Sequence, residues 1–387
     1  RGISLNPGNL ANVGDGLTLG VIRGSLNIGG LNILNIAALA ARCATGRPRR
    51  HVAPVMLGMA FLTLITLLLI FTNVWGYVGI AGVYLRNRFY LPFLIAGAGM
   101  VAPWLLPARA EAAPRDNAPH ASALPAVAGA MLALLAVAGV LCRAARPAPV
   151  DASLRTITVL TYNMQQGSAL DGDQNYWGQL AFIRAVDPDI IGLQESDVAR
   201  PSGGQVDAAR FFAEALGFYH YYGPNAISGT FGTAIVSRFP LQDPVSFFSY
   251  STTDEIGTAA AVIEVGGRRI AFFNSPPAGR PAAMQAHVDA LMSEAHKHGH
   301  VIAVGDYNFR QATPYYEKVV ETLADSWLAL YPDGIGVMPD TGAPLDMTRR
   351  IDHIFVSPDF EVLEAHYVPA PASQTDHPAH WSVIRWE

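Results

Sequence analysis

Charged residues are scarce in this sequence, and cysteine is nearly absent. Only 15% of the 387 residues are Asp, Glu, Lys or Arg, and the mean hydropathy is +0.24. This composition is too apolar for an ordinary soluble protein. The two cysteines, Cys43 and Cys142, lie at the edges of apolar segments. The C-terminal half is therefore not a disulfide scaffold, and we expect no cysteine chemistry there.

Acidic residues are almost missing from the first 150 positions. That part holds 12 basic and 3 acidic residues, whereas the part from residue 151 onward holds 14 basic and 28 acidic residues. The sequence thus joins a basic, apolar half to an acidic half with a net charge of −14. An acidic domain repels a polyanion, which argues against a nonspecific nuclease, although a local positive cleft is compatible with this count.

Long uncharged runs fill the N-terminal half. Val52–Gly76 carries no charge, and two further apolar segments cover Phe89–Leu106 and Ala123–Leu141. A fourth, Leu17–Ala41, is interrupted by Arg23 and is either a packed span or an interfacial segment. Runs of this length are typical of transmembrane helices rather than of buried core helices. We predict an all-α transmembrane region of three to four helices in residues 1–146.

Arginine placement predicts the orientation of these helices. The loop Arg42–His51 contains four arginines, the densest basic cluster of the chain. Because basic loops stay in the cytoplasm, either three or four spans place the acidic half outside it. Residues 147–155, with Pro147 and Pro149, form the predicted linker to a domain over residues 156–387.

The acidic half mixes short apolar strands with helices, which indicates an α/β fold. The predicted helices are Tyr176–Val186, Ala208–Leu216 and Ala282–His298. The predicted strands are Thr156–Tyr162, Ile190–Leu193, Ala234–Ser237, Ala259–Val265, Arg269–Asn274, Val301–Val304, Arg350–Val356 and Trp381–Trp386.

The apolar run Val301–Val304 is typical of a central strand, and it stops at Gly305. Asp306 and Asn308 follow, two residues apart. If the strand continues, both side chains lie on the same side of the backbone, where they could hold phosphate or metal-bound water. The alternative is that they only form a turn.

Other strands also end or begin at polar residues: Asn163, Glu195 and Asp352, with Asp376 and His377 before the last strand. Their order predicts loops that converge at one rim of a strand-built core. Carboxylates and amides are hard oxygen ligands that suit Mg²⁺ or Mn²⁺. His377 offers a proton-transfer group, and Asp352 could fix its tautomer.

The motifs TYNM, LQES, GTAIVSRFP, GDYN, RIDHIF and TDHP, in this order, resemble the endonuclease/exonuclease/phosphatase superfamily from Thr156 to the C-terminus. The resemblance implies a two-sheet α/β sandwich with a divalent metal at one rim. It also implies that Glu195 is the principal Mg²⁺ ligand (Mn²⁺ is possible), with Asn163 and Asp376 nearby.

The same resemblance implies the catalytic roles. Asp306 would orient and deprotonate the attacking water, and Asn308 would hold a phosphate oxygen. His377, polarised by Asp352, would contact the phosphate. Such a site suits phosphodiester hydrolysis, which depends on stabilising negative charge and aligning a water.

The chain departs from the family pattern at two positions. Pro276 stands where relatives usually carry His, and proline neither donates a proton nor hydrogen-bonds a phosphate. Arg280 could fill the gap as a substrate-binding residue. Thr233 stands where many relatives carry Asn.

A narrower likeness lies in the stretch Gln194–Asp207 and in the pairing of spans with this domain. Both resemble eukaryotic membrane proteins that remodel the lipid of GPI anchors. Asp197 and Arg200 match a D-x-x-R pattern of that branch, which makes Arg200 a candidate substrate-binding residue together with Asn163 and Arg280.

We therefore expect a membrane-anchored, Mg²⁺-dependent phosphodiesterase or phosphatase that acts on a phosphate ester, with a lipid headgroup as the favoured substrate. The alternatives are an extracytoplasmic nuclease and a non-hydrolytic lipid-binding or remodelling module that retains the fold. We expect packing rather than a cleft for Tyr219, Tyr221 and Tyr222, and a solvated surface rather than a metal site for His287, His296, His298 and His300.

Overall fold

The structure is a computed structural model of the 387-residue chain. It describes residues 153–198, 206–224, 231–251 and 255–387, together with residues 60, 61, 64 and 131. Apart from residues 60, 61, 64 and 131, the predicted spans lie outside the described residues, as do both cysteines and Arg200. Within the described ranges, no helix combines the length and the apolar character needed to cross a membrane.

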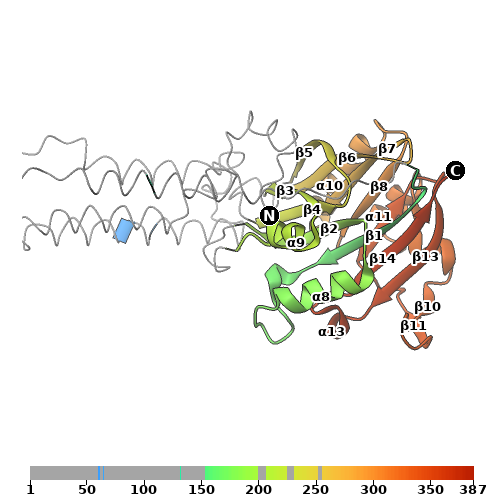
Figure 1. The fold of residues 1–387 in the computed structure, drawn as a ribbon. Helices are drawn as coiled ribbons and strands as arrows, with labels where there is room; N and C mark the ends of the chain where they lie inside the picture. Colours follow the sequence, from blue (N-terminus) through green and yellow to red (C-terminus); the bar gives the residue numbers. More distant parts are fainter. Residues whose placement is uncertain are drawn as a thin grey trace, which may run out of the picture.

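Two six-stranded sheets form the domain (Figure 1). In spatial order, the first sheet contains β13 (Glu361–Val368), β14 (Ala379–Arg385), β1 (Thr156–Asn163), β2 (Ile190–Asp197), β4 (Phe231–Ser237) and β3 (Tyr219–Pro224). The second contains β5 (Leu241–Tyr250), β6 (Glu255–Val265), β7 (Arg268–Ser275), β8 (Val301–Asp306), β12 (Asp352–Val356) and β9 (Ala324–Asp325). A separate hairpin pairs β10 (Ile335–Val337) with β11 (Pro344–Asp346).

One parallel pair lies at the centre of each sheet. β1 pairs in parallel with β2, and β7 pairs in parallel with β8, whereas the other pairings of the two sheets are antiparallel. The carboxyl ends of parallel neighbours reach the same edge of a sheet. The ends of β1, β2, β7 and β8 therefore carry the residues that form the site described below.

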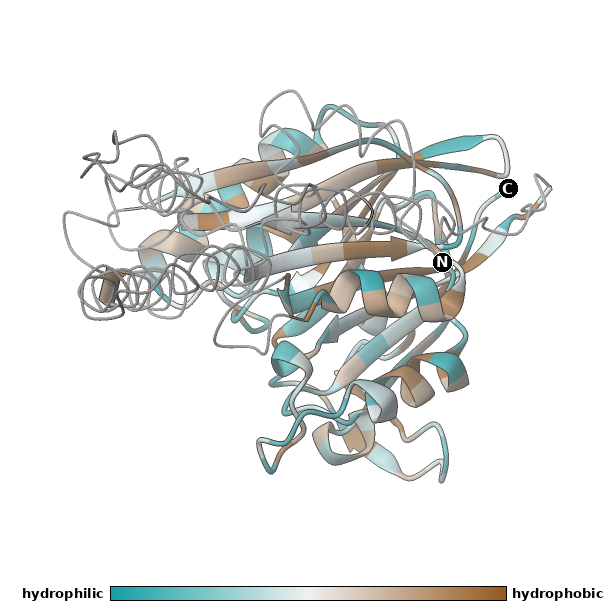
Figure 2. Ribbon diagram, turned by 60° about the vertical axis from the view of Figure 1, so that its left-hand side comes forward, coloured by the Kyte–Doolittle hydropathy of each residue, from teal (hydrophilic) through white to brown (hydrophobic). Residues whose placement is uncertain are grey.

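The main core lies between the two sheets. Apolar side chains of both inner faces pack there, among them Ile157, Val159, Ile190, Ile235, Ile263, Phe272, Ile302, Val304 and Ile354. Figure 2 shows apolar residues (brown) concentrated along the strands, while the helices carry both apolar and polar (teal) positions. This is the expected pattern when each helix buries one face against a sheet.

Helices cover the outer faces of the sandwich. α8 (Tyr176–Val186) and α9 (Ala208–Leu216) pack on the first sheet, and α10 (Pro281–Ala295) and α11 (Pro314–Val320) pack on the second. The short helices are α12 (Ser326–Leu330), α13 (Ala370–Ser373) and the 3₁₀ turn η2 (Gln165–Gly167). The predicted two-sheet α/β sandwich is confirmed.

Local sequence signals explain where these helices begin and end. Asn175 caps α8 by accepting a hydrogen bond from the backbone N–H of Gly178, and Asp207 caps α9 in the same way. Gly217 ends α9 with a φ of 73°, a left-handed conformation that suits glycine. Both helices have the predicted bounds.

Other predicted bounds need correction. α10 ends at Ala295 instead of His298, because Lys297 and His298 form turns with the N–H groups bonded to carbonyls three residues back. β2 continues beyond Leu193 to Asp197, and β12 begins at Asp352 instead of Arg350.

The predicted surface position of His287 is wrong. This side chain lies on α10 with 1% of its area exposed, and its ring centroid is 6.1 Å from that of Tyr307. The tyrosine prediction holds: Tyr221 is buried in the main core, where Tyr219 packs against it, and Tyr222 packs against the cluster under α9.

Candidate active site

Asn163 ends β1 and points into the sandwich. Strand alternation places it on the same face as the core residues Ile157 and Val159. Its side-chain Nδ2 donates hydrogen bonds to Asp306 Oδ2 at 3.0 Å and to Glu195 Oε1 at 3.4 Å. One amide thus links two carboxylates that come from different sheets.

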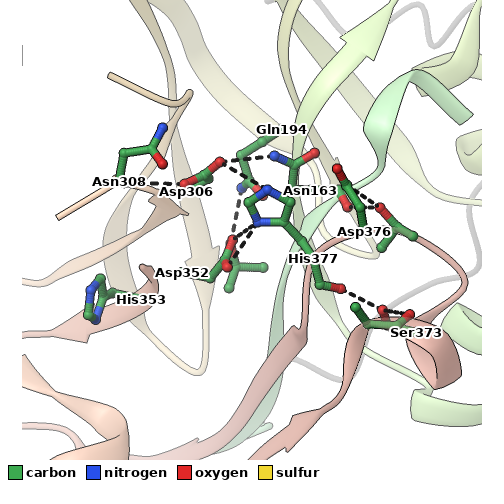
Figure 3. A network of polar contacts seen from close by, with 12 residues as sticks. Asn163, Gln194, Asp306, Asn308, Asp352, His353, Ser373, Asp376 and His377 are labelled. Atoms are coloured by element: carbon green, nitrogen blue, oxygen red, sulfur yellow. Dashed lines mark hydrogen bonds and ion pairs between the residues drawn. The ribbon is translucent and has the colours of Figure 1, made fainter. Parts of the chain in front are cut away.

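Asp306 ends β8 and faces the first sheet, on the side shared by the core residues Ile302 and Val304. The strand ends at Asp306, so the alternation of strand side chains does not determine where Asn308 points. Instead the backbone N–H of Asn308 donates to Asp306 Oδ1 at 3.2 Å, and Asn308 adopts a left-handed φ of 55°. The two residues therefore form a turn and do not continue the strand, and Figure 3 draws Asn308 on the opposite side of Asp306 from Asn163.

The His377 ring lies between two carboxylates (Figure 3). Its Nδ1 is 3.1 Å from Asp352 Oδ2, and its Nε2 is 3.7 Å from Asp306 Oδ2. The loop that carries the ring is held by Ser373, whose hydroxyl donates to the backbone carbonyl of His377 at 2.5 Å. Tyr162 O–H in turn donates to the carbonyl of Ser373 at 2.6 Å.

This crowding of charge shifts two pKa values. Burial, followed by the negative charges of Asp352 and Glu195, raises the pKa of Asp306 to about 7. Burial alone would lower the pKa of His377, but the hydrogen bond and charge of Asp352 and the charges of Asp306 and Asp376 raise it to about 10. At neutral pH, the site therefore combines an imidazolium with a carboxyl group that ionises near the ambient pH.

Glu195 reaches the site from an irregular part of β2. The β2–β4 register shifts between Leu193 and Ser196, and Glu195 has a left-handed φ of 48°. Its carboxylate accepts hydrogen bonds from the side-chain amides of Asn163 at 3.4 Å and Gln166 at 3.3 Å. Both contacts are long and both donors are neutral, so the Glu195 charge is not neutralised by them.

A buried ion pair lies beside the site. Arg350 and Asp325 form it at 2.5 Å, and their side chains are 1% and 3% exposed. Asp325 also accepts from Tyr316 O–H at 2.8 Å, and His353 Nε2 lies 3.0 Å from the carbonyl of Phe309, next to Asn308 in the chain. This network supports the loop that follows β8.

Comparison with known proteins identifies the family. The sequence profile described as the Endonuclease/Exonuclease/phosphatase family matches residues 160–377, more than half of the chain. This chain belongs to that family. The activities in the family's name all hydrolyse phosphate esters, so the chain has a phosphoesterase-type fold.

Individual relatives are more distant. The chain is 34% identical to Protein cwh43 of Schizosaccharomyces pombe over 89 residues, which are 23% of this chain and 9% of that protein, so it matches about a tenth of the length of this curated relative. A crystal structure of an endonuclease/exonuclease/phosphatase from Beutenbergia cavernae has a TM-score of 0.51 and 20% identity over 60% of this chain and 72% of that one. A mannosyl-6-phosphatase from Bacteroides thetaiotaomicron has a TM-score of 0.46 and 20% identity over 59% of this chain and all of that one.

The site has the donor chemistry that a divalent cation requires. Glu195 and Asn163 offer hard oxygen ligands, the Asn163 oxygen being the one that accepts from the backbone N–H of Gln165 at 3.0 Å. After burial, the negative charges of Asp352 and Glu195 raise the pKa of Asp306, and a cation would relieve that charge. A second possible ligand group, Asp306, Asp352 and His377, has its ligand atoms within 4.8 Å of one another. We favour the first set, because the His377 imidazolium already pairs with both carboxylates of the second.

Other predicted site residues lie farther out. Asp376 is exposed and accepts a hydrogen bond from the Thr375 hydroxyl at 3.3 Å. Figure 3 draws it on the other side of Asn163 from Asp306. Arg280 is exposed at the N-cap of α10. Pro276 is buried and directly follows Ser275, which pairs with Gly305, so it stands beside the end of β8. The ligand and substrate-binding roles of Asp376 and Arg280 stay predictions.

Sequence reasoning missed three amide side chains. Gln166 contacts Glu195 from the turn η2, and Gln194 and Asn274 hydrogen-bond each other beneath the site at 2.6 Å. Gln194 belongs to the LQES motif and Asn274 ends the predicted strand Arg269–Asn274, but the sequence assigned neither of them a role. The signal that each is buried and polar appears only when the two sheets are packed together.

Proposed function

We propose that this chain is a metal-dependent phosphoric ester hydrolase that uses Mg²⁺, with Mn²⁺ as a substitute. One observation carries the proposal: the Asp306 carboxylate lies within hydrogen-bond distance of the Asn163 amide and 3.7 Å from the His377 ring, which Asp352 holds on its other side. The Asp306 carboxylate as a base, the His377 imidazolium and the Asn163 amide as a donor thus meet at one point of the rim.

The roles follow from this geometry. Asp306, whose pKa is raised to about 7, accepts a proton from the attacking water at near-neutral pH. The His377 imidazolium stabilises negative charge on the phosphoryl group, and Asp352 fixes the ring through Nδ1. Asn308 would hold a phosphate oxygen, as the family resemblance implies. A Mg²⁺ held by Glu195 and Asn163, with Asp376 nearby, would supply positive charge to the phosphoryl oxygens.

We further propose a membrane lipid headgroup as the substrate. The uncharged run Val52–Gly76 and its two companions support a membrane anchor, and a domain with net charge −14 is poorly suited to a nucleic acid. The resemblance to proteins that remodel GPI-anchor lipid favours the same substrate class. The arginine-rich loop Arg42–His51 supports an orientation with the catalytic domain outside the cytoplasm. There Arg200 and Arg280 would bind the headgroup phosphate.

The test measures hydrolysis by the full chain with Mg²⁺ and with EDTA. The substrates are bis-p-nitrophenyl phosphate, vesicles of phospholipid and phosphoinositide, and DNA, and the control is Asp306→Ala. We expect Mg²⁺-dependent turnover of the diester and of a vesicle lipid that the control lacks. DNA cleavage without lipid turnover would replace the lipid proposal with the nuclease alternative.

Pro276 favours one second candidate, a lipid-binding module without hydrolysis. It removes the histidine that relatives usually carry beside this rim, and it lies next to the end of β8. A folded chain that binds Mg²⁺ but hydrolyses none of these substrates would support that candidate and contradict the hydrolase.

A further inference from the structure

The position of Glu195 contradicts the alternation of β2. Ile191 and Leu193 lie on the outer face, in the cluster under α8 and α9. A regular strand would send Glu195 to the same outer face, two residues after Leu193. Instead Glu195 contacts Asn163, whose side chain lies on the inner face.

A β-bulge produces this change of face. The register shift between Leu193 and Ser196 inserts an extra residue, and the left-handed φ of 48° at Glu195 turns its side chain toward the rim. Such a backbone conformation is strained for a residue with a Cβ, and it persists only where the surroundings impose it.

Asn274 supplies contacts from the opposite sheet. It lies on β7, on the inner face shared by Ile270 and Phe272. Its Nδ2 donates to the backbone carbonyls of Leu193 and Ala234, both at 2.8 Å. These two residues are the last regular pair of β2 and β4 before the register shift. One buried amide therefore satisfies two carbonyls at the point where the ladder is interrupted.

Gln194 fixes the orientation of that amide. Its Nε2 donates to Asn274 Oδ1 at 2.6 Å, to Thr161 Oγ1 at 3.0 Å and to the carbonyl of Gly192 at 3.1 Å. A Cβ at Gly192 would come within 2.9 Å of Asn274 Oδ1 and 2.4 Å of a methyl carbon of Val304, so glycine is needed for this close approach.

We propose that Asn274 is a positioning residue for the metal site: from the second sheet it holds β2 in the bulge that turns Glu195 to the rim, and Gln194 keeps its amide in place. Among the described residues, Asn274 makes no hydrogen bond to Asp306, Asp352 or His377. The inference rests on the proposed function, in that Glu195 is taken as a metal ligand. It also gives a physical role to the Gln of LQES and to an Asn that no catalytic role explains.

The test measures Mn²⁺ affinity of the full chain by calorimetric titration, beside urea unfolding without metal. The variants are Asn274→Asp, which removes the two N–H donors, and Gln194→Met, an apolar replacement of similar size that is milder for folding. The control is Ser382→Ala on β14. It removes a buried hydroxyl that donates to Ser326 Oγ at 2.9 Å. We expect both variants to bind Mn²⁺ about 10–100-fold more weakly, as loss of a group that orients a ligand does, while the control binds it unchanged.

Folded variants that keep the wild-type affinity would overturn the role of Asn274 and leave the hydrolase proposal intact. An affinity loss in Ser382→Ala as large as in the variants would also overturn it, because the loss would then follow general stability. A wild-type chain that binds no Mn²⁺ would instead contradict the proposed metal site and, with it, this inference.

Discussion

Asp306 and Asp352 are directly paired residues on two antiparallel strands, β8 and β12, and the His377 ring lies between their carboxylates. The pairing sets both negative charges at one edge of the second sheet, and the ring comes from a loop of the first sheet (Figure 3). The imidazolium thereby links the two sheets electrostatically at the rim. Several measurable consequences depend on this arrangement.

Replacing Asp352 with Asn should lower the pKa of His377 from about 10 toward its ordinary value, because the hydrogen bond and charge of Asp352 are the largest effects that raise it. At pH 8 the ring then loses its proton, and we expect hydrolysis to fall about 10²–10⁴-fold, with partial recovery at pH 6. NMR titration of His377 and rates at both pH values measure this. Glu364→Gln beside the surface residue His366 is the control; an unchanged His377 pKa in Asp352→Asn would contradict the prediction.

Asp306→Asn should abolish hydrolysis and yet stabilise the metal-free protein. The folded-state pKa of Asp306 is raised to about 7 by burial and by neighbouring carboxylates, so the folded state loses stability as this group ionises between about pH 4 and pH 7. Asn cannot ionise. We expect a gain of about 1–2 kcal/mol at pH 8 and none at pH 4, from urea unfolding with EDTA. A variant that is no more stable than the wild type at pH 8 would show that the ionised Asp306 carboxylate does not destabilise the folded state.

His287 should make the fold acid-sensitive. Burial lowers its pKa to about 4, and neither ring nitrogen has a hydrogen-bond partner among the described residues. The folded state prefers the neutral ring. The free energy of unfolding therefore includes a His287 contribution of about 3 kcal/mol that is fully present above pH 6.5 and is lost as the pH falls toward 4. We expect His287→Phe to remove this part of the pH dependence of urea unfolding. The exposed His296→Phe serves as the control, and a wild-type slope in His287→Phe would count against the argument.

Arg350→Met should destabilise the domain strongly. It leaves Asp325 charged and buried without its cation, which typically costs about 3–5 kcal/mol. The double variant Arg350→Met/Asp325→Asn should be more stable than the single variant, because no uncompensated charge remains. Urea midpoints of the two proteins decide between the outcomes; a double variant less stable than the single one would mean that hydrogen bonds from Asp325 dominate.

Two exposed apolar side chains in the segment that runs from η2 into α8 allow a test of the lipid proposal. Leu170 is 57% exposed and Trp177 is 72% exposed, and the neighbouring Tyr176 O–H donates to the carbonyl of Gln166, which itself contacts Glu195. Apolar and tryptophan side chains partition into the membrane interface. We expect Leu170→Ala/Trp177→Ala to slow turnover of vesicle lipid about tenfold or more and to leave bis-p-nitrophenyl phosphate hydrolysis unchanged.

The matched control is Val245→Ala, an exposed position on β5, which Figure 1 draws at the opposite edge of the domain from α8. Equal loss on both substrates would indicate damage to the site itself. No loss on vesicles would indicate that the bilayer is not approached at Leu170 and Trp177.

The sequence by itself determined the family and the bounds of α8 and α9, and it predicted β1, β2, β4, β6, β7, β8, β12 and β14 in their order, but not the remaining strands. It also placed Asn163 and Asp306 at the ends of strands, because the apolar pattern of a strand is a property of the local sequence. The convergence of Asn163, Glu195, Asp306, Asp352 and His377 at one rim agrees with the predicted order of motifs.

Only the tertiary structure decided how Glu195 and Asn308 reach the rim and that His287 is buried. Glu195 depends on a bulge contacted by Asn274, about 80 residues away in the chain, and Asn308 depends on a turn closed by the Asp306 carboxylate. Local periodicity is set by neighbours along the chain, whereas a bulge, a left-handed φ and the burial of a histidine are set by contacts across two packed sheets.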